Sequence, residues 1–173
     1  IGSISLSGVA GNTSTLDNIS VREINPLAVS FGYKALVTYA DTNADNGKLF
    51  QWFADNSNSI FGMFSTFGAR TGSLYWAQES LGVTDTVTGS STAYTPGINV
   101  PISVASRHGS TFLNGAVDGT ALTANTTPVS FPALTGKDLI IAPSGGPQVI
   151  QEFIMWGGTT GDIGDTGLED TST

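Results

Sequence analysis

The chain has 173 residues and a mass of 17.8 kDa, the size of a single domain that can bury a core of its own. It carries 14 acidic and 6 basic residues, a net charge of -8, so its field repels phosphate backbones and anionic membrane surfaces and nucleic acid is not an expected partner. The absence of cysteine excludes disulfides, thiol nucleophiles and zinc–thiolate sites, and no apolar run approaches the ~20 residues of a membrane-spanning helix, so membrane insertion is not expected.

Short runs of alternating or β-branched apolar residues, separated by Gly, Asn, Asp or Pro, follow one another along the chain. No stretch has the 3.6-residue period of an amphipathic helix. Strands are predicted over residues 4–6, 18–24, 35–40, 49–54, 59–64, 73–79, 99–106, 110–113, 138–142 and 148–156. Many short strands without a helix predict an all-β fold, an antiparallel β-sandwich or jelly roll.

Turns and connections are predicted from Gly, Asn, Asp and Pro. Residues 55–58, with the sequence DNSN, and the pair Asn114-Gly115 are typical of hairpin turns. Residues 82–97 and 119–132 are rich in small polar residues and are expected to be long connections.

The domain organisation is predicted in three parts. Residues 1–25 are either the end of an upstream module or the first strands of this one, because the Pro at the end of INP breaks a strand. Residues 26–160 form the β-sandwich, and residues 161–173 are a Gly- and Asp-rich tail whose last residues are expected to be poorly ordered. Since the chain does not begin with Met, we expect it to be a fragment that lacks an N-terminal part.

The densest cluster of oxygen ligands is the segment DTNADNG, which begins at Asp41. Asp41, Asn43 and Asp45 are spaced as at the start of a calcium loop, because hard cations take carboxylate and amide oxygens at alternating positions. The segment departs from the helical calcium-loop pattern, since its Gly comes one place late and position twelve is Trp52 rather than Glu. A plain connecting turn is the favoured interpretation, with bound calcium as the alternative and no other cofactor expected.

His108 is the only histidine, and the surrounding sequence RHGS is typical of an exposed hairpin turn. The alternative is a catalytic base. A polysaccharide lyase or glycosidase would then use His108 and Arg107 with Tyr94 or Glu152, the Arg neutralising a uronate carboxylate. The acidic residues are spread singly, without the carboxylate pair that glycoside hydrolysis usually needs.

Aromatic residues are paired on two predicted strands, Trp52 with Phe53 and Tyr75 with Trp76. Successive residues on a strand face opposite sides, so one of each pair is expected to point outward. Tryptophans of a sandwich usually belong to the core. The alternative is that Trp52 or Trp76 stacks on a sugar ring, with hydrogen bonds from loop residues Asn43, Asp45, Asp55, Asn56 and Arg70.

The segment VASRHGSTFLNGAVDG, residues 104–119, resembles the strand, turn and strand of laminin-G-type and concanavalin-A-like sandwiches. KDLIIAPSGG and QEFIMWGG are similar to the late pair of strands of that family. DNISVREINP resembles a sequence segment common where β-sandwich modules of bacteriophage and bacterial surface proteins join. The chain thus looks like the concanavalin-A-like domain of a bacteriophage or phage-derived tail fibre or spike, although no closing helix is recognisable after the last strand.

This resemblance implies a non-catalytic carbohydrate-binding module that recognises host surface polysaccharide. It also implies a place on the virion surface or outside the cell, a neighbouring virion protein as a further partner, and a homotrimeric assembly. A structural decoration or oligomerisation domain is an alternative, in which Phe61, Phe64 and Phe67 would form the contact, unless they belong to the core. Fold resemblance alone does not decide among these functions.

Overall fold

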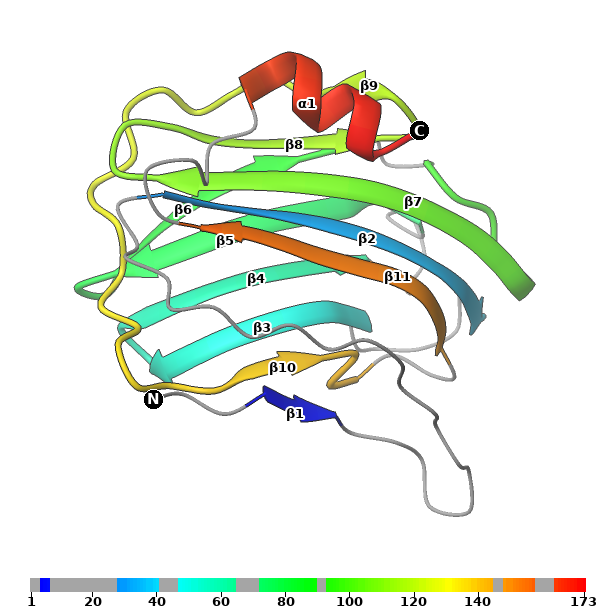
Figure 1. Ribbon diagram of the computed structural model, residues 1–173, viewed down its shortest axis with the longest axis horizontal. Helices are drawn as coiled ribbons and strands as arrows, with labels where there is room; N and C mark the ends of the chain where they lie inside the picture. Colours follow the sequence, from blue (N-terminus) through cyan, green and yellow to red (C-terminus); the bar gives the residue numbers. More distant parts are fainter. Residues whose placement is uncertain are drawn as a thin grey trace.

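The computed structural model describes residues 4–6, 28–40, 47–64, 72–89, 93–144, 148–157 and 164–173. Within them, two β-sheets lie face to face, and a short helix lies across one end of the second sheet (Figure 1). The first sheet has the strand order β1 (Ile4–Leu6), β10 (Leu139–Ile141), β3 (Gly47–Asp55), β4 (Asn58–Phe64), β5 (Leu74–Ser80) and β6 (Val83–Thr88). The second has the order β11 (Gln148–Gly157), β2 (Ala28–Tyr39), β7 (Gly97–Gly109), β8 (Leu113–Val117) and β9 (Thr120–Ala121).

Neighbouring strands are antiparallel in both sheets, except that β1 runs parallel to β10. The predicted all-β antiparallel sandwich is therefore confirmed. The first strand, β1, is an edge strand of the six-stranded sheet and pairs with β10.

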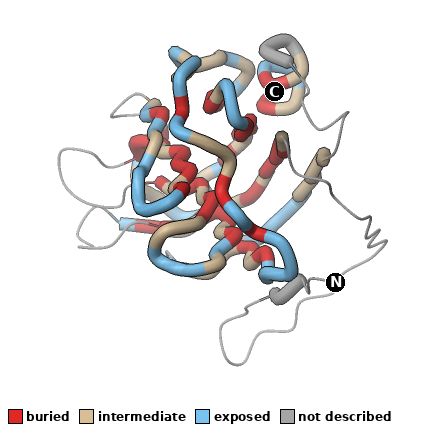
Figure 2. Tube along the Cα trace, turned by 90° about the vertical axis from the view of Figure 1, so that its left-hand side faces the viewer, coloured by how far each residue is buried: buried red, intermediate tan, exposed pale blue. Residues whose placement is uncertain are grey.

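The core lies between the sheets, where the tube of Figure 2 shows buried residues gathered along the strands. In β2, Phe31, Tyr33, Ala35 and Val37 alternate with residues that face away from the core, as a half-buried strand requires. A fully buried side chain of this size contributes about 1.5–3 kcal/mol relative to an exposed one.

A β-bulge interrupts this alternation in β3. The register between β3 and β4 shifts between Lys48 and Phe50, and the extra residue places both Leu49 and Phe50 in the core. As a result Lys48 and Gln51 both point to the outer face of the six-stranded sheet.

The turn predicted at residues 55–58 is confirmed as the link between β3 and β4. The Asp55 carboxylate accepts hydrogen bonds from the backbone N of Ser57 at 2.8 Å and the side-chain amide of Asn58 at 3.2 Å. Such side-chain bonds are what makes Asp favourable in a turn.

The turn predicted at Asn114-Gly115 is wrong, because both residues lie inside β8 and pair with β7. Gly115 faces the core, where an added Cβ would lie 2.6 Å from the indole ring of Trp76. The actual turn is Asp118-Gly119, with φ of 45° and 77°, a conformation that Asp and Gly tolerate.

Two strands and the helix were not predicted. β6 lies in the Thr-rich segment that was interpreted as a connection, and β9 is only a two-residue strand. The helix α1 (Gly164–Thr171) replaces the expected poorly ordered tail, since Leu168 is fully buried against Ala105 and Ala116. One buried leucine on small sheet residues anchors it, a contact that composition does not reveal. Among the described helices, none has the length and apolarity to cross a membrane.

Candidate functional site

The two predicted sugar-stacking tryptophans are not exposed. Trp76 has no accessible surface and Trp52 only 9%, and the indole Nε1 of Trp52 donates a hydrogen bond to the backbone oxygen of Lys137 at 3.0 Å. Both side chains belong to the core cluster between the sheets. The expectation that one of them forms an exposed platform is therefore wrong, and the core alternative holds.

One member of each aromatic pair does point outward, as predicted, but it is the other member. Phe53 is 40% exposed, and Tyr75 is partly exposed next to the buried Trp76. In β3 and β5, Trp52 and Trp76 pack into the core, and the neighbouring residue on each strand must then face outward. The exposed aromatic ring of each pair is therefore Phe53 or Tyr75.

Of the predicted loop residues, Asp55 and Asn56 lie in the described part of the chain. Asp55 and Asn56 are exposed in the β3–β4 turn, where the backbone hydrogen bond from Ser57 holds the pKa of the Asp55 carboxyl below its usual range. Gly47, where β3 begins, is roughly 26 Å away along the strand, at 3.3 Å per residue.

The remaining predicted ligand-binding and calcium residues, Asp41, Asn43, Asp45 and Arg70, lie outside the described residues. Among the described residues, no three His, Asp or Glu side chains are grouped to hold a metal ion.

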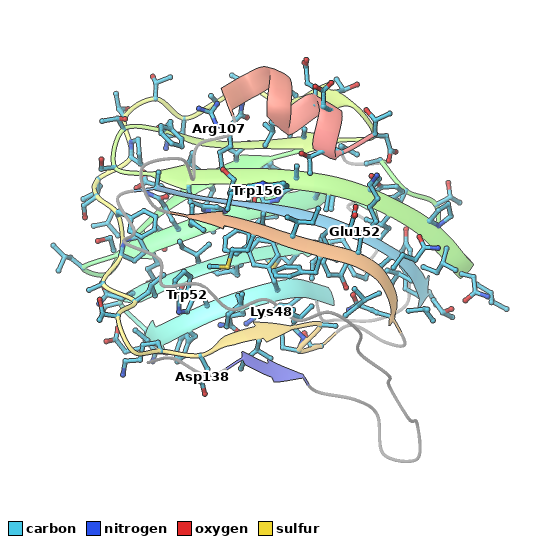
Figure 3. The ribbon with its side chains drawn as sticks, in the orientation of Figure 1. Lys48, Trp52, Arg107, Asp138, Glu152 and Trp156 are labelled. Atoms are coloured by element: carbon cyan, nitrogen blue, oxygen red, sulfur yellow. The ribbon has the colours of Figure 1, made fainter. Side chains whose placement is uncertain are left out.

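The residues of the enzyme alternative do not converge either. His108 is fully buried inside β7 rather than exposed in a turn, so that prediction is wrong. Its neighbour Arg107 points to the opposite face of the sheet, over the Phe112 ring. Tyr94 is buried and donates to Asp118 at 2.9 Å, and Glu152 lies on β11 in an ion pair with Lys34. Figure 3 shows Arg107, Glu152 and Trp156 on the five-stranded sheet, apart from Lys48 and Trp52 on β3.

A different cluster stands out on the outer face of the six-stranded sheet. Phe61 of β4 and Tyr75 of β5 stack with ring centroids 6.0 Å apart and planes 23° from parallel. Neither ring belongs to the core, because Ile60 and Trp76 take the inward positions beside them. The two rings lie nearly parallel to each other on the outer face of the sheet.

A cation and an amide border these rings. The Lys48 ammonium lies 5.7 Å from the centroid of the Phe61 ring and donates a hydrogen bond to the Gln51 side-chain oxygen at 2.9 Å. Gln51 pairs directly with Phe61 across the β3–β4 ladder. We call the outward side chains of Lys48, Gln51, Phe61 and Tyr75 the platform.

Burial affects the titratable groups of the platform. It lowers the pKa of the Lys48 ammonium, because a charged group loses water there. It raises the pKa of the Tyr75 hydroxyl, which a side-chain hydrogen bond with Thr86 partly opposes and the negative charge of Glu79 reinforces. The Tyr75 hydroxyl therefore stays a neutral hydrogen-bonding group at physiological pH.

The platform combines what recognition of a sugar requires. Flat aromatic rings cover the apolar C–H face of a pyranose, while amide, hydroxyl and ammonium groups at the rim bond its oxygens. The side chains stand on three adjacent paired strands, which fix their spacing.

Sequence reasoning found only part of this cluster. Tyr75 was recognised as a member of an aromatic pair, and Phe61 as part of a phenylalanine stripe. Lys48 and Gln51 were missed as site residues because their outward direction depends on the bulge at Leu49, for which the sequence gives no clear signal.

No protein-family model and no curated protein sequence matches the chain. Several solved structures share its fold. The carbohydrate-binding module CBM40 of a Ruminococcus gnavus IT-sialidase, bound to α2,3-sialyllactose, superposes with a TM-score of 0.61 at 12% identity. That match covers 84% of this chain and 82% of the module.

Two larger proteins contain a similar unit. The leech intramolecular trans-sialidase complexed with 2,7-anhydro-Neu5Ac has a TM-score of 0.61 at 14% identity, over 84% of this chain and 23% of the enzyme. Domains LG4-5 of the mouse laminin α1 chain have a TM-score of 0.56 at 12% identity, over 80% of this chain and 36% of theirs. The chain thus spans about a quarter to a third of these two proteins.

These likenesses establish the fold. The domain has the same β-sandwich fold as the CBM40 module and the laminin LG domains, as the sequence resemblance implied. None of these structures supports the bacteriophage origin that the resemblance also suggested.

Proposed function

We propose that the domain is a non-catalytic glycan-binding module whose ligand stacks on the platform. The observation that carries this proposal is the Phe61–Tyr75 ring pair, which is stacked, partly exposed and bordered by Lys48 and Gln51. Aromatic rings left outside the core on a rigid sheet offer binding area at little cost in conformational entropy.

The comparisons support this proposal. The Ruminococcus gnavus module binds α2,3-sialyllactose and the leech enzyme holds 2,7-anhydro-Neu5Ac, both on proteins that contain this fold. The enzyme alternative has no comparable support, because His108 and Arg107 face opposite sides of β7.

Glycan-array binding with single variants tests the proposal. Phe61→Ala and Tyr75→Ala are each expected to lower affinity at least tenfold, about 1.4 kcal/mol. Phe53→Ala is the matched control, because Phe53 is a 40% exposed phenylalanine of the same sheet that lies outside the Phe61–Tyr75 pair. This variant is expected to bind glycan as the wild type does. Binding that survives both platform substitutions, with unchanged thermal melts, would contradict the proposal.

The biological setting follows from the sequence resemblance alone. We propose that the module acts at a particle surface or outside the cell, as the binding end of a phage or phage-like fibre. Adsorption of the purified domain to host cells, and its loss after removal of surface polysaccharide, would test this setting. Light scattering would test the homotrimer that the resemblance implies.

A further inference from the structure

Lys48 is a cation on the platform without a carboxylate partner among the described residues. The ion pair that the described residues form joins Lys34 to Glu152 on the five-stranded sheet. The Lys48 ammonium instead contacts a neutral amide and an aromatic face. Both contacts are weaker than an ion pair, so the ammonium keeps hydrogen-bonding capacity for a ligand.

The surroundings of Lys48 favour an anion. A cation that has lost part of its hydration is stabilised by an opposite charge more than a fully solvated cation is. The lowered pKa of Lys48 reports this partial loss of water. An anionic group bound there would replace the missing hydration and raise that pKa again.

Among the described residues, the acidic groups of this face lie at its other end. Glu79 and Asp138 border Phe53 through the strand registers, and Phe53 is roughly 16 Å from Lys48 along β3 at 3.3 Å per residue. That distance exceeds the screening length of about 8–10 Å in physiological salt. Among the described side chains of this face, the positive charge therefore lies at Lys48 and the negative charges lie near Phe53.

The chain's net charge of -8 opposes local binding of an anion only through those charges that lie close to Lys48. Charges on distant parts of the surface are screened beyond about 8–10 Å. They slow the approach of an anionic ligand, whereas the contact at Lys48 determines how long it stays.

We propose that the glycan of the platform is acidic: a carboxylate or sulfate on the sugar binds the Lys48 ammonium while the ring stacks on Phe61 and Tyr75. This inference rests on the proposed glycan-binding function. It adds the ligand class and assigns the role of charge recognition to Lys48.

An array that holds neutral, sialylated, uronic-acid-containing and sulfated oligosaccharides tests the inference. The wild-type domain is expected to prefer acidic glycans at least tenfold over their neutral counterparts. Lys48→Gln, which keeps a hydrogen-bonding side chain without charge, should abolish this preference, and Lys48→Arg should restore most of it. Lys34→Gln is the matched control and should leave the preference unchanged.

The outcomes separate the two proposals. If wild type binds only neutral glycans, or if Lys48→Gln keeps the preference for acidic ones, the acidic ligand is overturned while the glycan-binding function stands. If wild type binds no glycan on the array, the proposed function falls and this inference with it. The affinity for sialylated and uronic-acid-containing glycans is then compared with the affinity for sulfated glycans. The group bound more tightly, carboxylate or sulfate, is the one that Lys48 recognises.

Discussion

Both faces of the six-stranded sheet carry aromatic rings and side-chain amides, but those on the outer face are partly exposed and those on the inner face are buried. On the outer face, Tyr75 and Gln51 border solvent and keep hydrogen-bonding capacity. On the inner face, Trp76 and Gln78 are fully buried, and the Gln78 side-chain amide donates a hydrogen bond to the backbone oxygen of Gly109 on the other sheet. Tyr75 and Trp76 are adjacent in sequence, so one step along β5 moves an aromatic ring from the outer face of the sheet into the core.

The core between the two sheets holds polar atoms that its packing leaves unpaired. The indole Nε1 of Trp76, the side-chain oxygen of Gln78 and Nδ1 of His108 have no hydrogen-bond partner among the described residues. Such atoms cost stability. Amides and aromatic rings of this sheet are therefore accessible to a ligand only where the strand register exposes them.

The largest expected difference between the faces is in stability. Trp76→Ala should lower the unfolding free energy by about 3–5 kcal/mol, because it leaves a cavity between the sheets. Tyr75→Ala should lower it far less, since Tyr75 lies outside the core cluster. Urea unfolding of both variants measures this, and equal losses would contradict the assignment of the two faces.

Acid should destabilise the core between the sheets through His108. Burial lowers the pKa of its imidazole to about 3, whereas an unfolded His has a pKa of about 6.5. Between these values the unfolded chain binds a proton that the folded chain does not, so stability is complete above pH 6.5 and falls as the pH drops. The expected slope from this group is about 1.4 kcal/mol per pH unit.

Two measurements check the His108 prediction. The difference in pH slope between wild type and His108→Asn isolates this group from the carboxylates. An NMR titration of the imidazole in the folded protein gives its pKa directly, and a midpoint near 6.5 would contradict its burial.

The close approach of β8 to Trp76 provides a smaller test. Gly115→Ala places a methyl group 2.6 Å from the indole ring, and overpacking of this kind costs about 1–3 kcal/mol. Gly89→Ala is the control, because its Cβ would meet no atom nearer than 3.4 Å. Thermal melts of the two variants should differ, and identical melting temperatures would mean that the sheets are not so closely packed there.

The smallest expected effect is at the β5–β6 turn. Leu81 has a φ of 54° and is 79% exposed, a conformation that costs a leucine roughly 1–2 kcal/mol. Leu81→Asn should raise the unfolding free energy by up to about 1 kcal/mol, since Asn adopts this conformation readily and no packing is lost. A decrease would show that Leu81 makes contacts that stabilise the turn.

The all-β architecture could be predicted from the sequence, because alternating apolar residues indicate strands and Gly, Asn and Asp indicate turns, and both are local patterns. The strand at 59–64 and the turn at 55–58 are examples. What could not be predicted depends on pairing between distant segments. Gly115 looks like a turn glycine until Trp76 is placed over it, and His108 looks exposed until β7 is seen to continue past it to Gly109.

The candidate site shows the same limit. Alternation predicted that one aromatic of each pair points outward, but the core decides which one, and the bulge in β3 decides where Lys48 points. Helix α1 depends on Leu168 packing against small residues of the second sheet. Each of these outcomes is settled by tertiary packing, which overrides local pattern.

NMR mapping of a bound glycan tests the central claim most directly. The probe is an oligosaccharide selected on the array, titrated into the isotopically labelled domain. The account predicts that side-chain resonances of Phe61, Tyr75 and Lys48 shift on binding while those of Trp76 and His108 stay in place. Shifts confined to other residues, with an unperturbed platform, would contradict it.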